Sequence, residues 1–488
     1  MNSSKAIVSL HRWTNFAQVR QLLHQALIDL GGIQRFVHSG DLVVIKPNLT
    51  ADAPASSGGT THVELVEALI EEIKPAQPGR IIVAEGTGRF GTSHETAFPT
   101  GGWREMAARQ GVELYNLDAG PHEDHQPPKP RYPYPLPFSK LILDADVFIS
   151  VPCLKTHLSA DYTVALKNNY ALIPQWKRSE IHRQYLLEEA ITDLNRIRKA
   201  DLIIVDGWDG SEGIAGGITF KRPAGARLLM AGDDPVAVDV VAREVMQLTA
   251  PTRYLSWAIE DGVGCGDLGQ ITLKGDPLDA CRHRFLSPAE EILELHPELT
   301  IYDLNACSGC RIPALSAIRR SLQSKLLQPL TVIFGQEGEP GPLRGKTLVI
   351  GDCAERFKGK GLFVPGCPPH PEAIIQVLRD EGIVCQKCLT AVQKVLPEFS
   401  PELLAHLRVT AAGTQAFIGE QVKRGEWHLE LLVGDCLSHY AQAVIERAPH
   451  FGIDPERDII WVKGCPPSLQ EIREALTRFA ELLRQVPS

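Results

Sequence analysis

The sequence has little of what nucleic-acid-binding and membrane-spanning proteins require. Aromatic residues make up only 6% of its 488 residues, and the formal net charge is −9. Because a nucleic-acid surface needs clustered Lys and Arg interleaved with stacking rings, this composition argues against a nucleic-acid partner. No run of 18 apolar residues occurs, so the sequence predicts no membrane span. The first residues contain no apolar signal segment, and we therefore expect the protein to stay in the reducing cytoplasm.

Length and patterning favour a multidomain α/β protein. With 44% hydrophobic residues, the chain can bury a large core and is expected to divide into two or three domains. In residues 1–285, apolar runs rich in β-branched residues alternate with helical patterns, which is typical of a largely parallel sheet covered by helices. These runs are residues 6–10, 42–45, 80–84, 147–151, 202–205 and 227–231. Residues 120–137 are dense in Pro and His, and we expect an irregular surface segment in extended form, whose His122 and His125 are solvated rather than metal-bound.

Eight of the eleven cysteines form one pattern that occurs twice. Each copy has a Cys-x-x-Cys pair, a Gly-Asp-Cys element and a Gly-Cys-Pro-Pro element. The cysteines are Cys307, Cys310, Cys353 and Cys367 in the first copy, and Cys385, Cys388, Cys436 and Cys465 in the second. Four thiolates are the number that a [4Fe–4S] cluster takes from a protein, and a Pro often follows a ligand Cys in cluster loops. The sequence therefore predicts two [4Fe–4S] clusters; structural zinc, and disulfides or inert thiols, are the alternatives.

The cysteines follow predicted strands, so the two copies are interpreted as small α/β units at residues 286–382 and 383–488. In the first copy, Cys367 and two prolines precede a predicted helix at 371–379, and another helix is expected at 314–325. The positive end of a helix dipole lowers a thiol's pKa and stabilises the negative charge of a cysteinyl cluster. Gly366 and Gly464 allow the backbone to approach the cluster sulfurs closely.

The order of these elements, with Val-Pro-Gly-Cys-Pro-Pro-His-Pro-Glu-Ala-Ile at 364–374, resembles the proximal-cluster region of [NiFe] hydrogenase small subunits. It is also similar to the 20-kDa-type subunit of NADH:quinone oxidoreductase. The resemblance implies a cluster-binding α/β unit. It does not imply hydrogenase activity, because the ligands lie closer together here and the chain encodes no [NiFe] large subunit.

Polar residues that follow strands or open turns in the first domain form a second candidate site. Three lysines and two histidines in one crevice would favour a carboxylate or phosphate ligand, with a histidine as proton donor. The candidates for catalysis are Lys155, His157, Lys167 and His182, and those for binding are Lys46, Asn168, Gly86 and Gly88. The two glycines belong to a Gly-x-Gly-x-x-Gly loop, interpreted as an anion cradle rather than a dinucleotide site. The alternative is that the lysines are solvated strand-end residues and the histidines ordinary helix or loop residues.

Acidic residues of the same domain suggest two further roles. Asp206 and Asp209 lie in a Gly-rich turn after a strand, and their carboxylates are candidate ligands for a divalent cation. Asp234 precedes Pro235 at the start of a helical pattern, so we interpret it as an N-cap.

Six segments of residues 5–275 together resemble domain-of-unknown-function family 362. They are VVIKPNL at 43–49, TTHVELVEAL at 60–69, VPCLKTH at 151–157, ALKNNY at 165–170, IVDGWDGSEG at 204–213 and AGDDPVAVDVVA at 231–242. Members of this family often carry appended iron–sulfur modules, so the resemblance implies a fold unit associated with electron transfer.

Taken together, these patterns predict an iron–sulfur oxidoreductase. Two [4Fe–4S] clusters would relay electrons to or from a pocket for an anionic small molecule, and a ferredoxin-like protein is the expected redox partner. A non-catalytic electron carrier or redox sensor is the first alternative, and a zinc-stapled binding module is the second.

Overall fold

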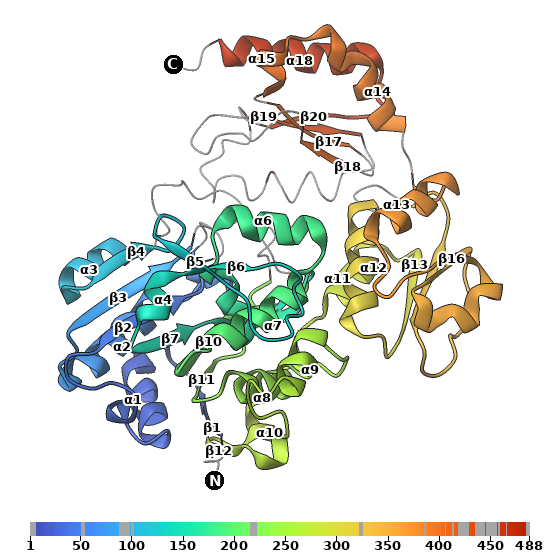
Figure 1. Ribbon diagram of the computed structural model, residues 1–488. Coiled ribbons are helices and arrows are strands. Elements are labelled where there is room, and N and C mark those ends of the chain that lie inside the picture. The colour runs from blue at the N-terminus through green and yellow to red at the C-terminus, as the bar shows by residue number, and fades with distance from the viewer. Residues whose placement is uncertain are drawn as a thin grey trace. The chain divides into compact units, whose positions relative to one another are not determined.

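The computed structural model describes residues 6–49, 54–86, 98, 102–214, 222–321, 326–384, 387–405, 407–411, 414–417, 429–434, 445, 456, 459–464 and 466–484. The chain forms two compact units, Met1–Glu290 and Glu291–Ser488. The expected division of the second part near residue 382 stays a prediction. The protein is a mixed α/β molecule (Figure 1), as the sequence predicts.

A large, mostly parallel sheet forms the centre of the first unit. Its strands, in spatial order, are β12 (Thr272–Gly275), β1 (Ile7–Arg12), β11 (Leu228–Gly232), β10 (Leu202–Ser211), β7 (Val147–Val151), β2 (Leu42–Pro47), β3 (Arg80–Glu85) and β4 (Glu113–Asn116). Only β11 in this series pairs antiparallel with its neighbours. Two short strands, β8 (Cys153–His157) and β9 (Asp161–Thr163), extend the sheet, since β8 pairs parallel with β10. The carboxyl ends of β2, β3, β7 and β10 therefore meet at one edge.

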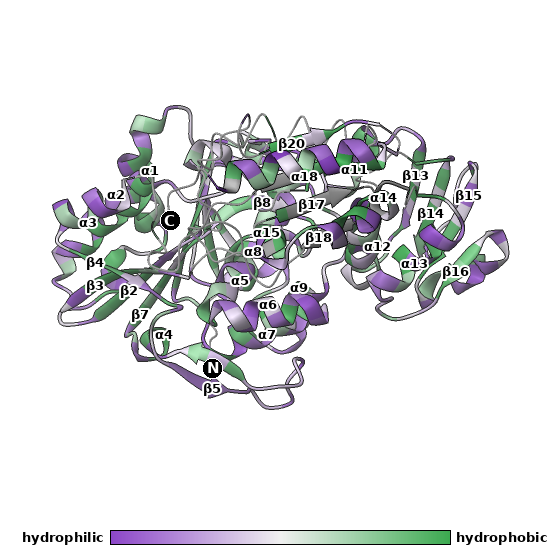
Figure 2. Cartoon of the chain, turned by 90° about the horizontal axis from the view of Figure 1, so that it is seen from above, coloured by the Kyte–Doolittle hydropathy of each residue, from purple (hydrophilic) through white to green (hydrophobic). Residues whose placement is uncertain are grey.

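Helices cover both faces of this sheet because side chains alternate along each strand. On β2, for example, Val44 packs into one apolar core, whereas Val43 and Ile45 pack into the other. The helices α1 (Val19–Asp29), α2 (Val63–Ile73) and α3 (Trp103–Gln110) contribute to the core that contains Val43. The helices α4 (Lys140–Asp144), α5 (Ala165–Asn168), α6 (Gln175–Gln184), α7 (Leu187–Ile197), α8 (Pro235–Met246), α9 (Arg253–Glu260) and α10 (Leu278–Cys281) contribute to the other core. In Figure 2 the central strands are mostly green, whereas the helices show both green and purple faces.

Local signals at helix ends are partly confirmed. Asp234 caps α8, because its carboxylate accepts hydrogen bonds from the backbone N–H groups of Val236 and Ala237. The segment at 120–137 is extended at its ends, as expected, but these ends form regular paired strands rather than irregular structure. There β5 (His122–His125) pairs antiparallel with β6 (Leu136–Ser139), so the polar sequence of β5 obtains its strand conformation from backbone pairing.

The second unit contains a fully parallel four-stranded sheet next to the first Cys motif. Its order is β13 (Leu299–Leu304), β14 (Leu330–Gly335), β15 (Lys346–Ile350) and β16 (Leu362–Val364). The associated helices are α11 (Pro288–Leu295), which spans the boundary between the units, α12 (Ser308–Ser321) and α13 (Pro371–Asp380). The predicted helix at 314–325 was placed too late, since α12 begins at Ser308 and contains Pro313.

A second four-stranded sheet follows in the same unit. Its order is β18 (Thr414–Phe417), β17 (Leu407–Ala411), β19 (Leu429–Val433) and β20 (Ile459–Val462), and only the β17–β18 pair is antiparallel. The described helices here are α14 (Lys387–Val395), α15 (Pro401–Ala405) and α18 (Leu469–Leu483). That the two sheets are copies of one repeated unit stays a prediction. Within the described part of the chain, no helix has the length and apolar character needed to cross a membrane.

Candidate functional site

A buried ion pair lies at the carboxyl ends of β2 and β3. The Lys46 ammonium is 2.9 Å from Glu85 Oε1, and both side chains are almost fully buried. Lys46 also donates to the side-chain oxygen of Asn168 at 3.2 Å. Burial lowers the pKa of Lys46, and the Glu85 carboxylate opposes that effect. The positive charge of Lys46 is therefore balanced by the Glu85 carboxylate inside the protein.

A second lysine joins the same group through Asn48, which follows β2. Lys155, on β8, donates to Asn48 Oδ1 at 2.6 Å and to the backbone oxygen of Gly59 at 2.8 Å. Asn48 in turn donates to Asn168 Oδ1 at 3.0 Å. Burial lowers the pKa of Lys155 to about 8. Both of these acceptor oxygens are neutral.

The third lysine, Lys167, is on the short helix α5. It is 8% exposed. Within the residues that the structure describes, its ammonium has neither a hydrogen bond nor an ion pair. Burial, followed by the positive charges of Lys155 and Lys46, lowers its pKa to about 7. The fold thus brings four of the residues predicted from the sequence to one edge of the sheet: Lys46, Lys155, Lys167 and Asn168.

A histidine that the sequence interpretation missed lies beside this lysine group. His62, the N-cap residue of α2, places Nδ1 2.9 Å from Asp206 Oδ2 and Nε2 3.2 Å from Asp209 Oδ2. Burial favours the neutral ring, but the two carboxylates raise the pKa of His62 to about 10. The ring also packs against Phe16, with centroids 4.9 Å apart. Asp206 and Asp209, proposed from the sequence as cation ligands, thus have the imidazolium as their partner.

The remaining predicted residues of the first domain lie apart from the lysines or have other partners. His157, at the end of β8, accepts a hydrogen bond from the backbone of Ser159. His182, on α6, packs edge-on against the ring of Tyr170 at 5.4 Å. The N–H group of Gly86 donates to Glu85 Oε1 at 2.8 Å. Gly88 lies outside the described residues.

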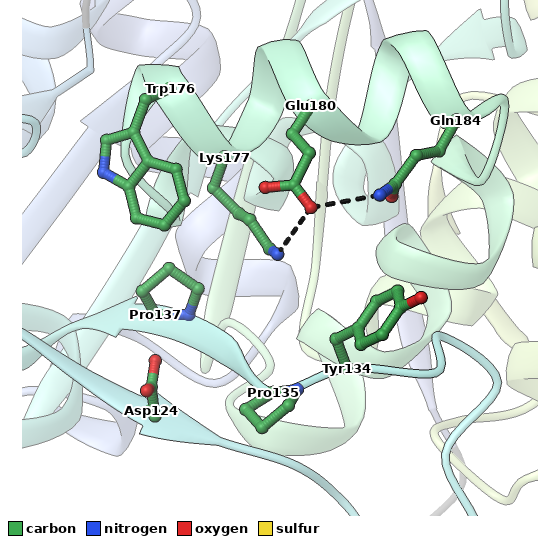
Figure 3. Close-up of a pocket in the computed structure, with 8 residues that line it drawn as sticks. All are labelled: Asp124, Tyr134, Pro135, Pro137, Trp176, Lys177, Glu180 and Gln184. Carbon is green, nitrogen blue, oxygen red and sulfur yellow. Dashed lines mark hydrogen bonds and ion pairs between the residues drawn. The ribbon is translucent and has the colours of Figure 1, made fainter.

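A pocket of about 370 Å³ lies elsewhere in this unit, between α6 and the β5–β6 hairpin (Figure 3). Its lining residues are Asp124, Tyr134, Pro135, Pro137, Trp176, Lys177, Glu180 and Gln184. Lys177 points toward Glu180 and pairs with it at 3.1 Å. Because its lysine already has a carboxylate partner, this pocket has no uncompensated ammonium of the kind found at Lys167.

The four cysteines of the first motif lie at the carboxyl edge of the β13–β16 sheet. Cys307 directly precedes α12 and Cys310 is in its first turn, while Cys353 follows β15 and Cys367 follows β16. The parallel direction of these strands brings the three loops to the same edge. A hydrogen bond with Cys307, then burial, then the nearby thiols of Cys353 and Cys367 raise the pKa of Cys310.

Backbone contacts hold two of these cysteine loops together. The N–H group of Gly351 donates to Val364 O at 2.8 Å, and that of Asp352 donates to Gly366 O at 3.1 Å. A Cβ atom at Gly351 would lie 2.5 Å from Cys310 Sγ, so only glycine fits there. The predicted helix at 371–379 is confirmed as α13, with His370 as its N-cap, so Cys367 precedes the cap itself. The N-terminus of α12 instead coincides with Cys307 and Cys310.

The second sheet repeats part of this backbone geometry. The N–H group of Gly434 donates to Val462 O at 2.9 Å, as Gly351 does to Val364. Gly464 has φ 114° and a Cβ there would lie 2.7 Å from Pro467 Cα; Gly366 has φ 130° and the same 2.7 Å approach to Pro369 Cα. Cys385, Cys436 and Cys465 lie outside the described residues, as does the side chain of Cys388. Among the described side chains, no three His, Cys, Asp or Glu groups are arranged as ligands of a single ion.

Comparison with known proteins identifies a family for the segment that carries the lysine site. Residues 43–244 match the family described as Domain of unknown function (DUF362), which confirms the predicted resemblance over that segment. The chain is 28% identical over 252 residues to Thylakoid-associated protein sll1697 of Synechocystis sp., covering 50% of this chain and 74% of that protein. The lactate racemase apoprotein of Thermoanaerobacterium thermosaccharolyticum matches with 12% identity and a TM-score of 0.27, over 77% of this chain and 89% of that one. At that TM-score the likeness carries no argument about fold or activity.

Proposed function

We propose that this protein is an iron–sulfur oxidoreductase with two [4Fe–4S] clusters and a pocket for an anionic small molecule. The observation that carries the proposal is the convergence of Cys307, Cys310, Cys353 and Cys367 at one sheet edge. Four thiols suit a cubane cluster, and the N-terminus of α12 offers positive dipole charge to its first two ligands. The cluster would supply single-electron transfer.

The second motif supports a second cluster by analogy of backbone geometry. Gly434 and Gly464 have the positive φ angles of Gly351 and Gly366. They also make an equivalent strand-end hydrogen bond and an equivalent close approach to a proline. Cys388, Cys436 and Cys465, with Cys385, would be its ligands.

The lysine group supports an anionic substrate. Glu85 neutralises Lys46, whereas Lys167 has no carboxylate partner within the described part of the chain. An anionic group next to the Lys167 ammonium would lower the electrostatic cost of burying it. The same arrangement favours an oxidoreductase over a non-catalytic electron carrier or redox sensor, because the latter needs no such pocket.

A melting screen of the full-length, anaerobically purified protein with carboxylate and phosphate metabolites tests this distinction. A ligand at about a hundredfold its dissociation constant adds a few kcal/mol to stability. The stabilisation should disappear in Lys155→Ala and Lys167→Ala, and persist in Lys177→Ala, whose ammonium has its own carboxylate. If no anion stabilises the wild type, or if all variants respond alike, the protein is an electron carrier or sensor instead.

A further inference from the structure

The backbone that carries Lys167 is held by buried side chains on both sides. Asp239, from α8, accepts hydrogen bonds from the N–H groups of Ala165 at 2.8 Å and Leu166 at 3.4 Å. The side chain of Asn195, from α7, donates to the Leu166 carbonyl at 2.9 Å. Both Asp239 and Asn195 are buried. The start of α5 is therefore fixed by two other helices.

The residues after Lys167 are fixed in the same way. Asn168 donates to Ser150 Oγ at 2.9 Å, and Asn169 donates to Asn195 Oδ1 at 2.8 Å. Several buried polar groups thus position one lysine whose own ammonium has no partner among the described residues. Such support around an uncompensated group is typical of a functional side chain rather than of a structural one.

Lys177 is a buried lysine of the same protein whose charge has partners, and it serves as a comparison for Lys167. It is 7% exposed, nearly the same as Lys167 at 8%. It pairs with Glu180 and lies over the rings of Tyr132 and Tyr134. Its pKa is raised, whereas burial and two neighbouring lysines lower the pKa of Lys167 to about 7. Lys167 is therefore partly a neutral amine near neutral pH, and a desolvated amine beside other cations is an activated nucleophile.

We propose that Lys167 forms a covalent imine with a ligand that carries both an anionic group and an aldehyde or ketone. The inference rests on the anion pocket of the proposed function and not on the clusters. The nitrogen lone pair of Lys167 attacks the carbonyl carbon, and a C–N bond forms. The C–O bond then breaks, and the oxygen leaves as water with the two protons of the amine. The positive charge of Lys155, which acts on Lys167, would attract the anionic group.

The probe is glyoxylate, a two-carbon carboxylate with an aldehyde, used with cyanoborohydride on the native, full-length protein. Hydride reduces the imine carbon, which leaves a carboxymethyl group that peptide mass mapping locates. At pH 7 an amine of ordinary pKa is neutral in roughly one molecule in a thousand or fewer, so Lys167 should be modified at least about tenfold more than Lys177. Glycolate, which lacks the carbonyl, is the matched ligand that cannot form an imine.

Lys167→Arg separates charge from nucleophilicity. It should lose the adduct while glycolate and glyoxylate still stabilise it against melting. If Lys167 of the native protein stays unmodified while unfolded protein is labelled there, the imine proposal is overturned. If glycolate and glyoxylate stabilise the wild type and no adduct forms, the imine fails and the anion pocket stands. Iron content is measured in parallel, and its outcome bears only on the clusters.

Discussion

Replacement of Lys167 by Met should make the protein more stable near neutral pH. Met keeps the length of the side chain and removes its charge. The pKa of Lys167 falls from its ordinary 10.5 to about 7 in the folded protein. Since each pKa unit is worth about 1.4 kcal/mol, the buried ammonium costs the folded state roughly 5 kcal/mol below pH 7.

The sign of the pH dependence follows from proton binding. Between pH 7 and 10.5 the unfolded chain binds this proton and the folded protein releases it, so the Lys167 contribution to stability rises with pH. The advantage of Lys167→Met over wild type should therefore shrink by roughly 3 kcal/mol between about pH 6 and about pH 9.5. Groups common to both proteins, such as His62, cancel in this difference.

Thermal melting of both proteins across this pH range measures the effect, which should amount to several degrees for a unit of this size. Lys177→Met is the control, and it should lose stability, because it gives up an ion pair with Glu180. A variant Lys167→Met that is less stable than wild type at pH 6, or whose advantage does not change with pH, would show that the ammonium has a partner in solution.

Two further predictions concern His62 and the cysteines. His62→Gln should lower the stability of the protein most below pH 6.5 and progressively less toward pH 10. The reason is that the raised pKa of His62 stabilises the folded protein, and this stabilisation is lost as the pH rises to about 10. A loss of stability that does not change with pH in melting experiments would contradict this prediction. Cys367→Ser and Cys465→Ser should each remove about half of the bound iron, since each would break one of two cubanes, whereas Cys265→Ser should remove none. Full iron content with an unchanged EPR spectrum in either cluster variant would refute its assignment as a ligand.

The sheet of the first unit could be predicted because its strands are buried on both faces and therefore appear as short β-branched runs. Lys46 was found because it directly follows such a run, and Lys155 because it lies a few residues after one. Glu85 carries the same strand-end signal and could have been found by the same rule. His62 could not, because its partners Asp206 and Asp209 are more than a hundred positions away and meet it only through the fold.

Two of the predicted secondary-structure elements differ from the structure for physical reasons. The start of α12 was placed after Pro313 because a proline inside a helix removes an intrahelical hydrogen bond, yet the helix includes this residue. The β5 sequence His-Glu-Asp-His has no strand signal, and its conformation comes from pairing with β6. Sequence patterns indicate the conformational preference of a short segment, whereas the conformations of α12 and β5 also depend on the parts of the protein that pack or pair with them.

The most direct test of the iron–sulfur proposal is the quantification of iron, acid-labile sulfide and zinc in anaerobically purified, full-length protein. Two [4Fe–4S] clusters predict about eight iron and about eight sulfide per chain, with a brown colour. Stoichiometric zinc without sulfide would contradict the proposal and leave a zinc-stapled protein in its place.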